Sequence, residues 1–390
     1  MNTHLTEAPR LPSGQHWIDD EDRAAVDAVL RSAWLTTGPR VEAFERAVAD
    51  ACGAHHAVAV SSGTAALHAA MAAAAIGPGD EVIVPAITFV ATANAAVFQG
   101  ATPVFADVES STLLVDPAGV AAKITPRTKA IVAVDYAGQP CDYRALRAIA
   151  DRHGLVLIAD ACHALGAADH GQPVGSLADL STFSFHPVKH ITTGEGGMIT
   201  TQRAEWAERM RRFRNHGLDT DVRERRRQGT WRYDMTALGW NYRLSDLQCA
   251  LGLSQLRHLP AWVARRQTLA RRYRTAFTGI PGIEPLTVRS GATHAYHLFV
   301  IRIDAARYGA DRQQLFDACT AEGIGANVHY LPVHLHRFYR ECFGTAPGLC
   351  PQAETAYEQI LSLPIFPRMT DADVDRVIAI VRILARTPSR

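Results

Sequence analysis

The sequence predicts an α/β fold with a mostly parallel central sheet flanked by helices, followed by a smaller C-terminal α+β domain. Between about residues 56 and 200, short apolar runs alternate with helix-like segments. Apolar runs without polar interruption are typical of parallel strands that helices cover on both faces. In such a sheet, ligands bind beyond the carboxyl ends of the strands. The residues directly after each run are therefore the first candidates for a functional site.

The strands of this sheet are expected at 56–60, 81–85, 130–134, 155–160 and 181–185. Helix-like segments follow the first three of these runs, which is the pattern of successive strand–helix–strand units. A long helix-like stretch then covers 245–278, and Pro260 is expected to interrupt it.

The C-terminal unit is expected to hold one strand and two helices, at 297–303, 311–323 and 371–384. The arginine-rich segment 221–229 is expected to form an exposed loop. We therefore predict an N-terminal arm over 1–20, a large domain over 21–260 and a small domain over 261–390.

The formal net charge of +1 gives no electrostatic reason to expect nucleic acid or a membrane surface as a partner. No run reaches the ~18 apolar residues that a spanning helix needs, and the N-terminus has no apolar core of a signal peptide. The seven cysteines are scattered without a CxxC pair, which favours reduced thiols over a disulfide framework. We therefore expect a cytoplasmic protein.

The first strand ends at the turn Ser61-Ser62-Gly63-Thr64. A small turn that opens a helix presents backbone N–H groups at the positive end of the helix dipole, which suits a phosphate. The alternative is an ordinary strand-to-helix turn. Neither a GxGxxG fingerprint nor a P-loop lysine is present, which argues against an NAD-dependent oxidoreductase and a nucleotide-phosphate cradle.

Asp160 stands at the end of a strand that is expected to be buried. A carboxylate there requires a partner, because burying an unpaired charge is unfavourable by several kcal/mol. It either caps a following helix or pairs with a cationic ligand atom. Phe89 and His163 follow neighbouring strands, and each is either a packing residue or part of a platform for a planar ligand.

Lys189 follows the strand at 181–185 and precedes a glycine-rich turn, in the stretch FSFHPVKHITTGEGG. Burial lowers the pKa of a lysine and makes its amine a nucleophile for a Schiff base. Ser184 offers a hydroxyl for phosphate. A phosphate cradle, a platform, a carboxylate and a lysine together meet the demands of pyridoxal 5′-phosphate (PLP).

The motifs extend this pattern and resemble the DegT/DnrJ/EryC1/StrS family of PLP-dependent sugar aminotransferases, of fold type I, over almost the whole chain. They are WLTTGPRVEAFE, SSGTAALHAA, TFVATANA, DACHALGA, FSFHPVKHITTGEGG, RNHG, GWNYRLSDLQCALGLSQL and VHYLPVH. The resemblance implies that Lys189 binds PLP and later moves the substrate proton, and that Asp160 hydrogen-bonds the pyridine nitrogen.

The resemblance also implies roles for the other cofactor contacts. Gly63, Thr64 and Ser184 would bind the phosphate, and Phe89 would stack on the ring. His163, where many members carry Gln, would lie on the opposite ring face. Asn241 matches an asparagine that reaches the phosphate from the partner subunit, which implies a homodimer with shared active sites.

The chain is most similar to the branch that aminates C4 of UDP-linked 4-keto-6-deoxy hexoses, as in pseudaminic acid biosynthesis. The implied reaction moves the amino group of L-glutamate onto the sugar. Aminotransferases for dTDP-3-keto or 4-keto hexoses, or for keto-cyclitols, are the alternative. The candidates for the sugar pocket are Thr37, His186, Arg243, His329 and Tyr330. Each could equally serve packing, and Arg243 could instead pair with an acidic residue near the following helix.

Other readings have less support. The stretch HYLPVHLH holds three histidines, but their spacing fits no closed zinc pattern, so no metal is expected. A sugar dehydratase of the same family would carry histidine in place of Lys189. A catalytically silent regulatory protein with this fold is a further alternative, and no added DNA-binding segment supports it.

Overall fold

The computed structural model describes residues 10–385 and confirms the mostly parallel sheet flanked by helices. Six of the seven strands of the central sheet are parallel, and β9 alone runs antiparallel to both of its neighbours. The order across the sheet is β1 (His56–Val60), β9 (Gly197–Thr201), β8 (Leu180–Ser184), β5 (Val156–Asp160), β4 (Thr128–Val134), β2 (Glu81–Pro85) and β3 (Thr102–Ala106). The predicted runs each form one strand, whereas β3 and β9 were not predicted.

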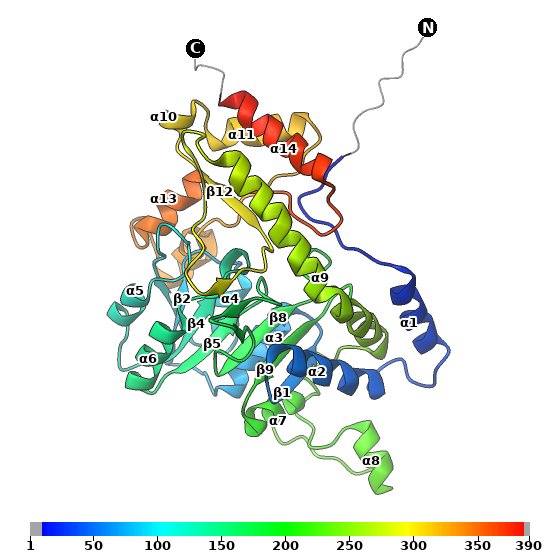
Figure 1. Ribbon diagram of the computed structural model, residues 1–390. Helices are drawn as coiled ribbons and strands as arrows, with labels where there is room; N and C mark the ends of the chain where they lie inside the picture. The colour runs from blue at the N-terminus through cyan, green and yellow to red at the C-terminus, as the bar shows by residue number, and fades with distance from the viewer. Residues whose placement is uncertain (1–9, 386–390) are drawn as a thin grey trace.

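Helices cover the sheet, which lies in the lower half of the molecule in Figure 1. They are α2 (Pro39–Cys52), α3 (Gly63–Ala73), α4 (Ala91–Phe98), α5 (Pro117–Ala122), α6 (Tyr143–His153) and α7 (Ala204–Phe213), with a 3-10 turn η1 (Tyr136–Gly138). Local sequence sets their ends. The Ser62 side chain caps α3 at its first turn, and Gly154 ends α6 in the left-handed conformation that glycine adopts without strain.

The helix α9 (Asp246–Phe277) is continuous, so the predicted interruption at Pro260 is wrong. Proline removes one backbone hydrogen bond from a helix. Here the residues around it are anchored by packing, because Leu259, Trp262 and Val263 are buried in the core. A capping box between Ser245 and Gln248 defines the start of the helix.

The C-terminal unit is an α+β arrangement above the large sheet in Figure 1. Its antiparallel sheet has the order β10 (Ile283–Pro285), β12 (Phe299–Ile303) and β13 (Ile360–Leu363). Its helices are α10 (Ala305–Tyr308), α11 (Arg312–Ala321), α12 (Arg337–Phe343), α13 (Pro351–Gln359) and α14 (Asp371–Leu384), with a 3-10 turn η2 (Val333–Leu335). A small sheet pairs β11 (Ala292–Thr293) of the C-terminal unit with the hairpin of β6 (Ala168–Asp169) and β7 (Gln172–Pro173), which lies between β5 and β8 in sequence.

Buried apolar side chains form two clusters, one on the large sheet and one in the C-terminal unit. The helix α9 contributes to both, with Trp262 in the first and Tyr273 in the second. We therefore propose that the boundary between the large and the small domain lies near residue 260. The described part of the predicted arm packs on the C-terminal unit, where the Leu11 backbone bonds to Gly323 and Gly325. Residues 1–9 of that arm lie outside the described residues.

Two further helices lie at the periphery. The helix α1 (Asp20–Leu30) begins with a capping box at Asp19. The segment expected as a loop instead forms α8 (Val222–Gln228), capped by the Asp221 side chain and ended by a left-handed Gly229. None of its residues is buried, so the predicted exposure is confirmed. The predicted loop conformation is wrong, because the segment is helical. Within residues 10–385, no helix combines the length and apolar character that crossing a bilayer requires.

Candidate active site

A cavity of about 520 Å³ lies at the carboxyl ends of the parallel strands, where the sequence placed the functional residues. It brings together ten of the predicted site residues. These are Gly63, Thr64, Phe89, Asp160, His163, Ser184, His186, Lys189, His329 and Tyr330. They come from the ends of β1, β2, β5 and β8 and from the segment before β13, so the fold joins residues that lie far apart in sequence.

Asp160 ends β5, and its carboxylate is held by two donors. The Thr92 hydroxyl donates to Oδ2 at 2.6 Å, and the Cys162 backbone N–H donates to Oδ1 at 3.3 Å. Thr88 in turn bonds Thr92 at 2.6 Å. No helix follows Asp160, so the alternative in which it caps a helix is wrong. The carboxylate is buried and fixed, yet it still borders the cavity.

Lys189 lies in the turn after β8, and its backbone N–H bonds to the His186 carbonyl at 2.9 Å. Burial lowers the pKa of Lys189 from its ordinary value, while the nearby Cys162 and Asp160 oppose the shift. Desolvation disfavours the ammonium form of lysine, so a larger fraction of the amine is neutral at a given pH. Lys189 therefore has the character of an amine nucleophile.

Close backbone contacts shape the cavity beside the first turn of α3. A Cβ atom added at Gly63 would lie 2.9 Å from the Cβ atom of Ser184, and one added at Gly197 would lie 2.3 Å from the Ser62 carbonyl oxygen. Both positions therefore require glycine. The backbone N–H groups at the start of α3 and the Ser184 hydroxyl border the same space, which suits a phosphate.

His163 lies on another wall of the cavity. Its Nε2 atom bonds the Tyr330 hydroxyl at 3.2 Å, whereas its buried Nδ1 atom has no partner among the described residues. Burial lowers the pKa of His163 well below its ordinary value, and Lys189 adds to this effect. Burial also lowers the pKa of His329 to about 4, and its Nδ1 atom bonds Ser362 at 2.9 Å. Both rings are therefore neutral near pH 7.

Two residues are exposed at this cavity. Phe89 is 56% exposed, so the reading of Phe89 as a core residue is wrong, and its ring centroid lies 5.9 Å from that of Tyr330. His186 is exposed and lines the same cavity from the turn before Lys189. Both are open to a ligand that enters from solvent.

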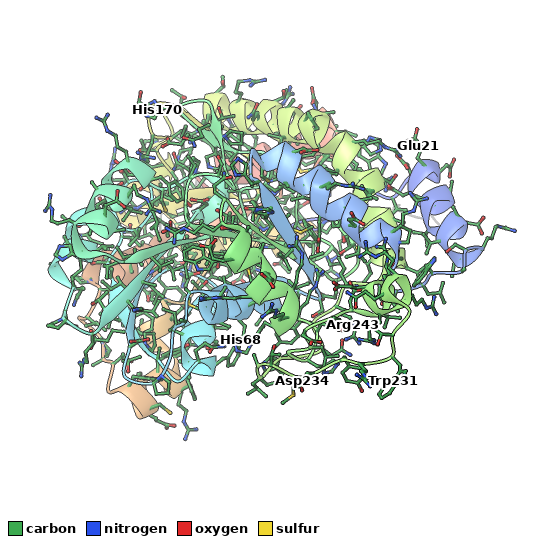
Figure 2. All side chains as sticks on the ribbon, turned by 90° about the horizontal axis from the view of Figure 1, so that it is seen from below. Glu21, His68, His170, Trp231, Asp234 and Arg243 are labelled. Atoms are coloured by element: carbon green, nitrogen blue, oxygen red, sulfur yellow. The ribbon has the colours of Figure 1, made fainter. Side chains whose placement is uncertain are left out.

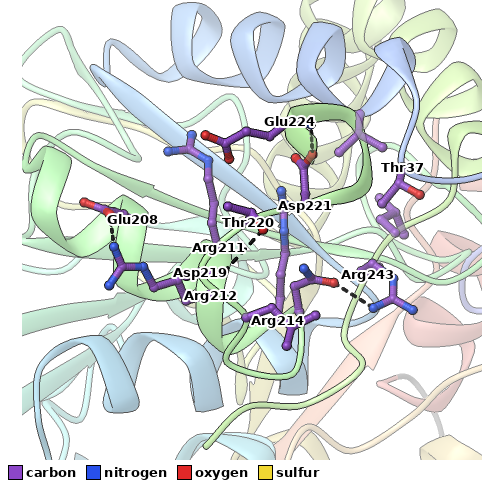
Figure 3. A pocket seen from close by; sticks show the side chains of 14 residues that line it. Thr37, Glu208, Arg211, Arg212, Arg214, Asp219, Thr220, Asp221, Glu224 and Arg243 are labelled. Carbon is purple, nitrogen blue, oxygen red and sulfur yellow. Dashed lines mark hydrogen bonds and ion pairs between the residues drawn. The ribbon is translucent and has the colours of Figure 1, made fainter. Parts of the chain in front are cut away.

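The structure does not bring Thr37, Arg243 and Asn241 into this cavity. Thr37 and Arg243 line a second cavity of about 260 Å³, which we call the arginine cavity. Figure 3 shows this cavity, with Arg211, Arg214 and Arg243 around it. Asn241 is exposed, and its backbone forms an isolated bridge with that of Asn215.

The arginines of this second cavity differ in their partners. Arg214 contacts Glu45, and Arg212 contacts Glu208. Arg243 bonds only the neutral side chain of Asn215, at 2.9 Å, among the described residues. The alternative in which Arg243 pairs with an acidic residue near the start of α9 is therefore wrong. Among the described residues its guanidinium forms no salt bridge, although Glu208, Asp219, Asp221 and Glu224 line the same cavity, so it can still pair with an anion.

Sequence reasoning missed several residues of the first cavity. They are Ser62, Leu67, Thr88, Ala91, Val134, Cys162, Val188, Glu195, His297, Asn327 and Val328, and Thr92 behind them. One signal was available: two hydroxyl residues, Thr88 and Thr92, closely follow a strand end, where ligands of a parallel sheet bind. The three histidines of HYLPVHLH do not converge, and no group of three metal-ligating side chains is found in residues 10–385.

The residues present fit PLP. The buried carboxylate of Asp160 can accept a hydrogen bond from a protonated ring nitrogen, and Lys189 can react with an aldehyde. Gly63 and Gly197 let the first turn of α3 lie close to Ser184, so its backbone N–H groups and the Ser184 hydroxyl can bind one phosphate together. The unpartnered Nδ1 atom of the buried His163 leaves a polar group to be satisfied at the same wall.

Comparisons with known proteins agree with this chemistry. The sequence profile of the DegT/DnrJ/EryC1/StrS aminotransferase family matches residues 16–382. The spore coat polysaccharide biosynthesis protein SpsC of Bacillus subtilis (strain 168) is 43% identical over 378 residues, which cover 96% of this chain and 97% of SpsC.

Solved structures with the same fold include PseC of Helicobacter pylori, an aminotransferase involved in the biosynthesis of pseudaminic acid. It is 33% identical, with a TM-score of 0.89 over 96% of this chain and 99% of PseC. DesV of S. venezuelae, solved with a ketimine intermediate, is 37% identical, with a TM-score of 0.88 over 97% of this chain and 100% of DesV. On the strength of the family match and of these identities, the chain belongs to the DegT/DnrJ/EryC1/StrS family of sugar aminotransferases.

Proposed function

We propose that this aminotransferase moves the amino group of L-glutamate onto the C4 ketone of a UDP-linked 4-keto-6-deoxy hexose. The cofactor is PLP, in keeping with the fold-type I family. When bound, PLP supplies an aldehyde that receives the amino group and a ring that withdraws electrons from the reacting carbon. The observation that carries the proposal is the convergence of Lys189, Asp160 and the Gly63–Ser184 cradle on one cavity.

The residues of the chain act on the cofactor in distinct ways. The Lys189 amine binds the aldehyde and later carries the proton to or from the reacting carbon, a role for which its lowered pKa prepares it. Asp160, held by Thr92, keeps the ring nitrogen protonated. Gly63, Thr64 and Ser184 would hold the phosphate, and Phe89 and His163, which line the same cavity, would hold the ring.

The electrostatics of the cavity favour an active site shared between two subunits. Both substrates are anions, because L-glutamate has two carboxylates and the nucleotide sugar has a diphosphate. Among its lining residues, however, the cavity has no arginine, and its lysine is engaged by the cofactor. Glu195 even adds a negative charge. We propose that the cation that binds the substrates comes from another chain and is Arg243, with the neighbouring neutral Asn241 as a hydrogen-bonding partner.

An exposed apolar surface adjoins these two residues. It consists of Trp231, Tyr233, Met235, Leu238 and Trp240, and we call it the 231–240 surface. Trp231 and Leu238 are 81% and 78% exposed. Figure 2 shows Trp231 at the edge of the molecule, on the same side as Arg243. Apolar clusters of this kind mark protein interfaces. In the proposed homodimer this surface covers the partner, and Asn241 and Arg243 reach its cavity.

The choice of sugar rests on the sequence pattern before Lys189 and on the similarity to PseC. His186, His329 and Tyr330 are proposed to contact the sugar, because they line the cavity close to Lys189. Thr37 and Arg243 are proposed to act on the nucleotide from the arginine cavity. The similarity to SpsC supports a product that is used in a surface polysaccharide. The free thiols of all seven cysteines support a cytoplasmic location.

Parallel assays of UDP- and dTDP-linked 4-keto and 3-keto hexoses test the substrate, with L-glutamate as the amino donor in each. The proposal expects amination of the UDP-linked 4-keto sugar at the highest kcat/KM. Turnover confined to a 3-keto sugar or a keto-cyclitol would contradict the C4 assignment while it left the family activity intact. A purified protein that binds no PLP would contradict the proposed chemistry as a whole.

A further inference from the structure

His297 is a buried residue of the cavity that the reaction described above does not use. It lies just before β12 and is 7% exposed. Its ring centroid is 4.3 Å from that of His163 and 5.7 Å from that of His190, which directly follows Lys189. His297 therefore lies between the residue proposed to face the cofactor ring and the neighbour of the reactive lysine.

The backbone on both sides of His297 is fixed to the turn η1. Ala295 donates to the Gly138 carbonyl at 2.9 Å, and Leu298 donates to the Ala137 carbonyl at 3.1 Å. A Cβ atom added at Gly138 would lie 2.8 Å from the His163 carbonyl oxygen and 2.9 Å from the His297 nitrogen. The backbones of His163 and His297 thus both pack against Gly138. This close packing fixes how far apart their rings lie.

The protonation of the neighbouring rings is also defined. The His190 Nε2 atom faces the Ala295 carbonyl at 3.1 Å, and a carbonyl can only accept, so this nitrogen carries the proton. The Tyr330 hydroxyl bonds His163 at Nε2. The Nδ1 atoms of His163, His190 and His297 are all buried without a partner among the described residues. Neither His163 nitrogen bonds to His297, so the contact between the two rings is one of packing, with their planes tilted by 45°.

We propose that His297 is a positioning residue whose ring sets the plane of His163 against the cofactor and keeps its Nε2 atom within reach of Tyr330. The inference rests on the proposed function for the contact between His163 and the cofactor. His297 itself does not touch the reacting atoms in this account. It acts through His163, so its contribution must disappear when the His163 ring is removed.

Two substitutions separate ring packing from hydrogen bonding. His297→Phe keeps a flat ring, whereas His297→Asn removes the ring face and keeps a polar group near the Nδ1 position. We expect His297→Asn to reduce the visible circular dichroism of the bound cofactor at least twofold and to slow the half-reaction with L-glutamate about tenfold. We expect His297→Phe to stay within about twofold of wild type in both measurements. The opposite order would overturn the proposal.

A double-mutant cycle with His163→Ala is the deciding experiment. Adding His297→Asn to His163→Ala is expected to change neither signal by more than about twofold, because coupled residues are not additive. A full tenfold loss in that background would refute action through His163. His334→Gln, which removes another buried histidine outside the cavity, is the matched control and should leave the dichroism unchanged. The dichroism needs no substrate, so a wild-type protein without cofactor would instead contradict the proposed function.

Discussion

The Thr92 hydroxyl donates a hydrogen bond of 2.6 Å to the Oδ2 atom of Asp160, although the two residues are 68 positions apart in the sequence. This contact fixes the carboxylate on which the proposed ring-nitrogen interaction depends. Both residues are buried, so the bond is shielded from water. A hydrogen bond to a charged group contributes about 1.5–3 kcal/mol, and losing it here leaves Asp160 less well oriented.

Thr92→Val tests this contact, because it keeps the shape of the side chain and removes the hydroxyl. We expect PLP to bind about 10- to 100-fold more weakly, as titration of the protein with the cofactor would measure. The exposed Thr268→Val on α9 is the control and should bind PLP as wild type does. Unchanged affinity in Thr92→Val would mean that Asp160 needs no support from Thr92.

A second prediction concerns pH and stability at Asp135, which directly follows β4. Burial raises the pKa of Asp135 to about 7, and its Oδ2 atom has no partner among the described residues. In the unfolded chain an aspartate titrates near pH 3.9, so between these values the folded state holds a proton that the unfolded state has lost. The free energy of unfolding therefore falls as the pH rises from about 4 to about 7.

Asp135→Asn removes this titration. Thermal unfolding of wild type and variant at pH 5 and pH 8 should show a larger loss of melting temperature for wild type between the two pH values. At pH 5 the melting temperature of the variant is expected to equal or lie below that of wild type. At pH 8 the wild type should have lost more of its melting temperature than the variant. An equal loss in both proteins would contradict a raised pKa at Asp135.

The shared active site predicts complementation between two inactive variants. Lys189→Ala removes the reactive amine from one cavity, and Asn241→Ala removes the proposed contact to the cavity of the partner. After denaturation and refolding of an equal mixture, half of the dimers are mixed, and each mixed dimer has one intact site. About one quarter of the wild-type activity should therefore return. No recovery above the two separate variants would mean that each subunit completes its own site.

Substitution of Arg243 is expected to weaken binding of the sugar substrate more than the reaction with L-glutamate. Arg243→Ala should raise the KM for the nucleotide sugar about tenfold or more, because a guanidinium–phosphate pair is a strong charge-assisted contact. The half-reaction with L-glutamate, followed by absorbance without sugar, should change less than about threefold if Arg243 meets only the diphosphate. Arg227→Ala on the exposed helix α8 is the matched control. Equal losses in both half-reactions would assign Arg243 to the cofactor instead.

The sheet and the cofactor residues could be predicted from the sequence because their signals are local. Apolar runs located β1, β2 and β5, and the rule that ligands bind at strand ends singled out Asp160 and Lys189. The helix α8 escaped prediction because its short polar sequence has no apolar face from which to recognise a helix. The predicted interruption of α9 at Pro260 was wrong because burial of the flanking side chains outweighs the loss of one backbone hydrogen bond.

Contacts between segments that lie far apart in the sequence could not be predicted from local sequence patterns. Nothing near Thr92 indicates Asp160 as its partner, and nothing near His297 indicates His163. Thr37 and Arg243 were grouped with the sugar pocket, yet within one subunit they lie in the separate arginine cavity. Whether that cavity joins the site of a partner depends on how two copies associate, and a single sequence pattern does not encode that geometry.

The most direct test of the account is the visible spectrum of the purified protein before and after addition of L-glutamate. The account predicts an absorption band of lysine-bound PLP that gives way to the spectrum of the aminated cofactor when L-glutamate is added. Lys189→Ala should lack the initial band while it retains the fold. An absent band in wild type, a band that L-glutamate does not change, or the same band in Lys189→Ala would contradict the assignment of Lys189 as the residue that binds PLP.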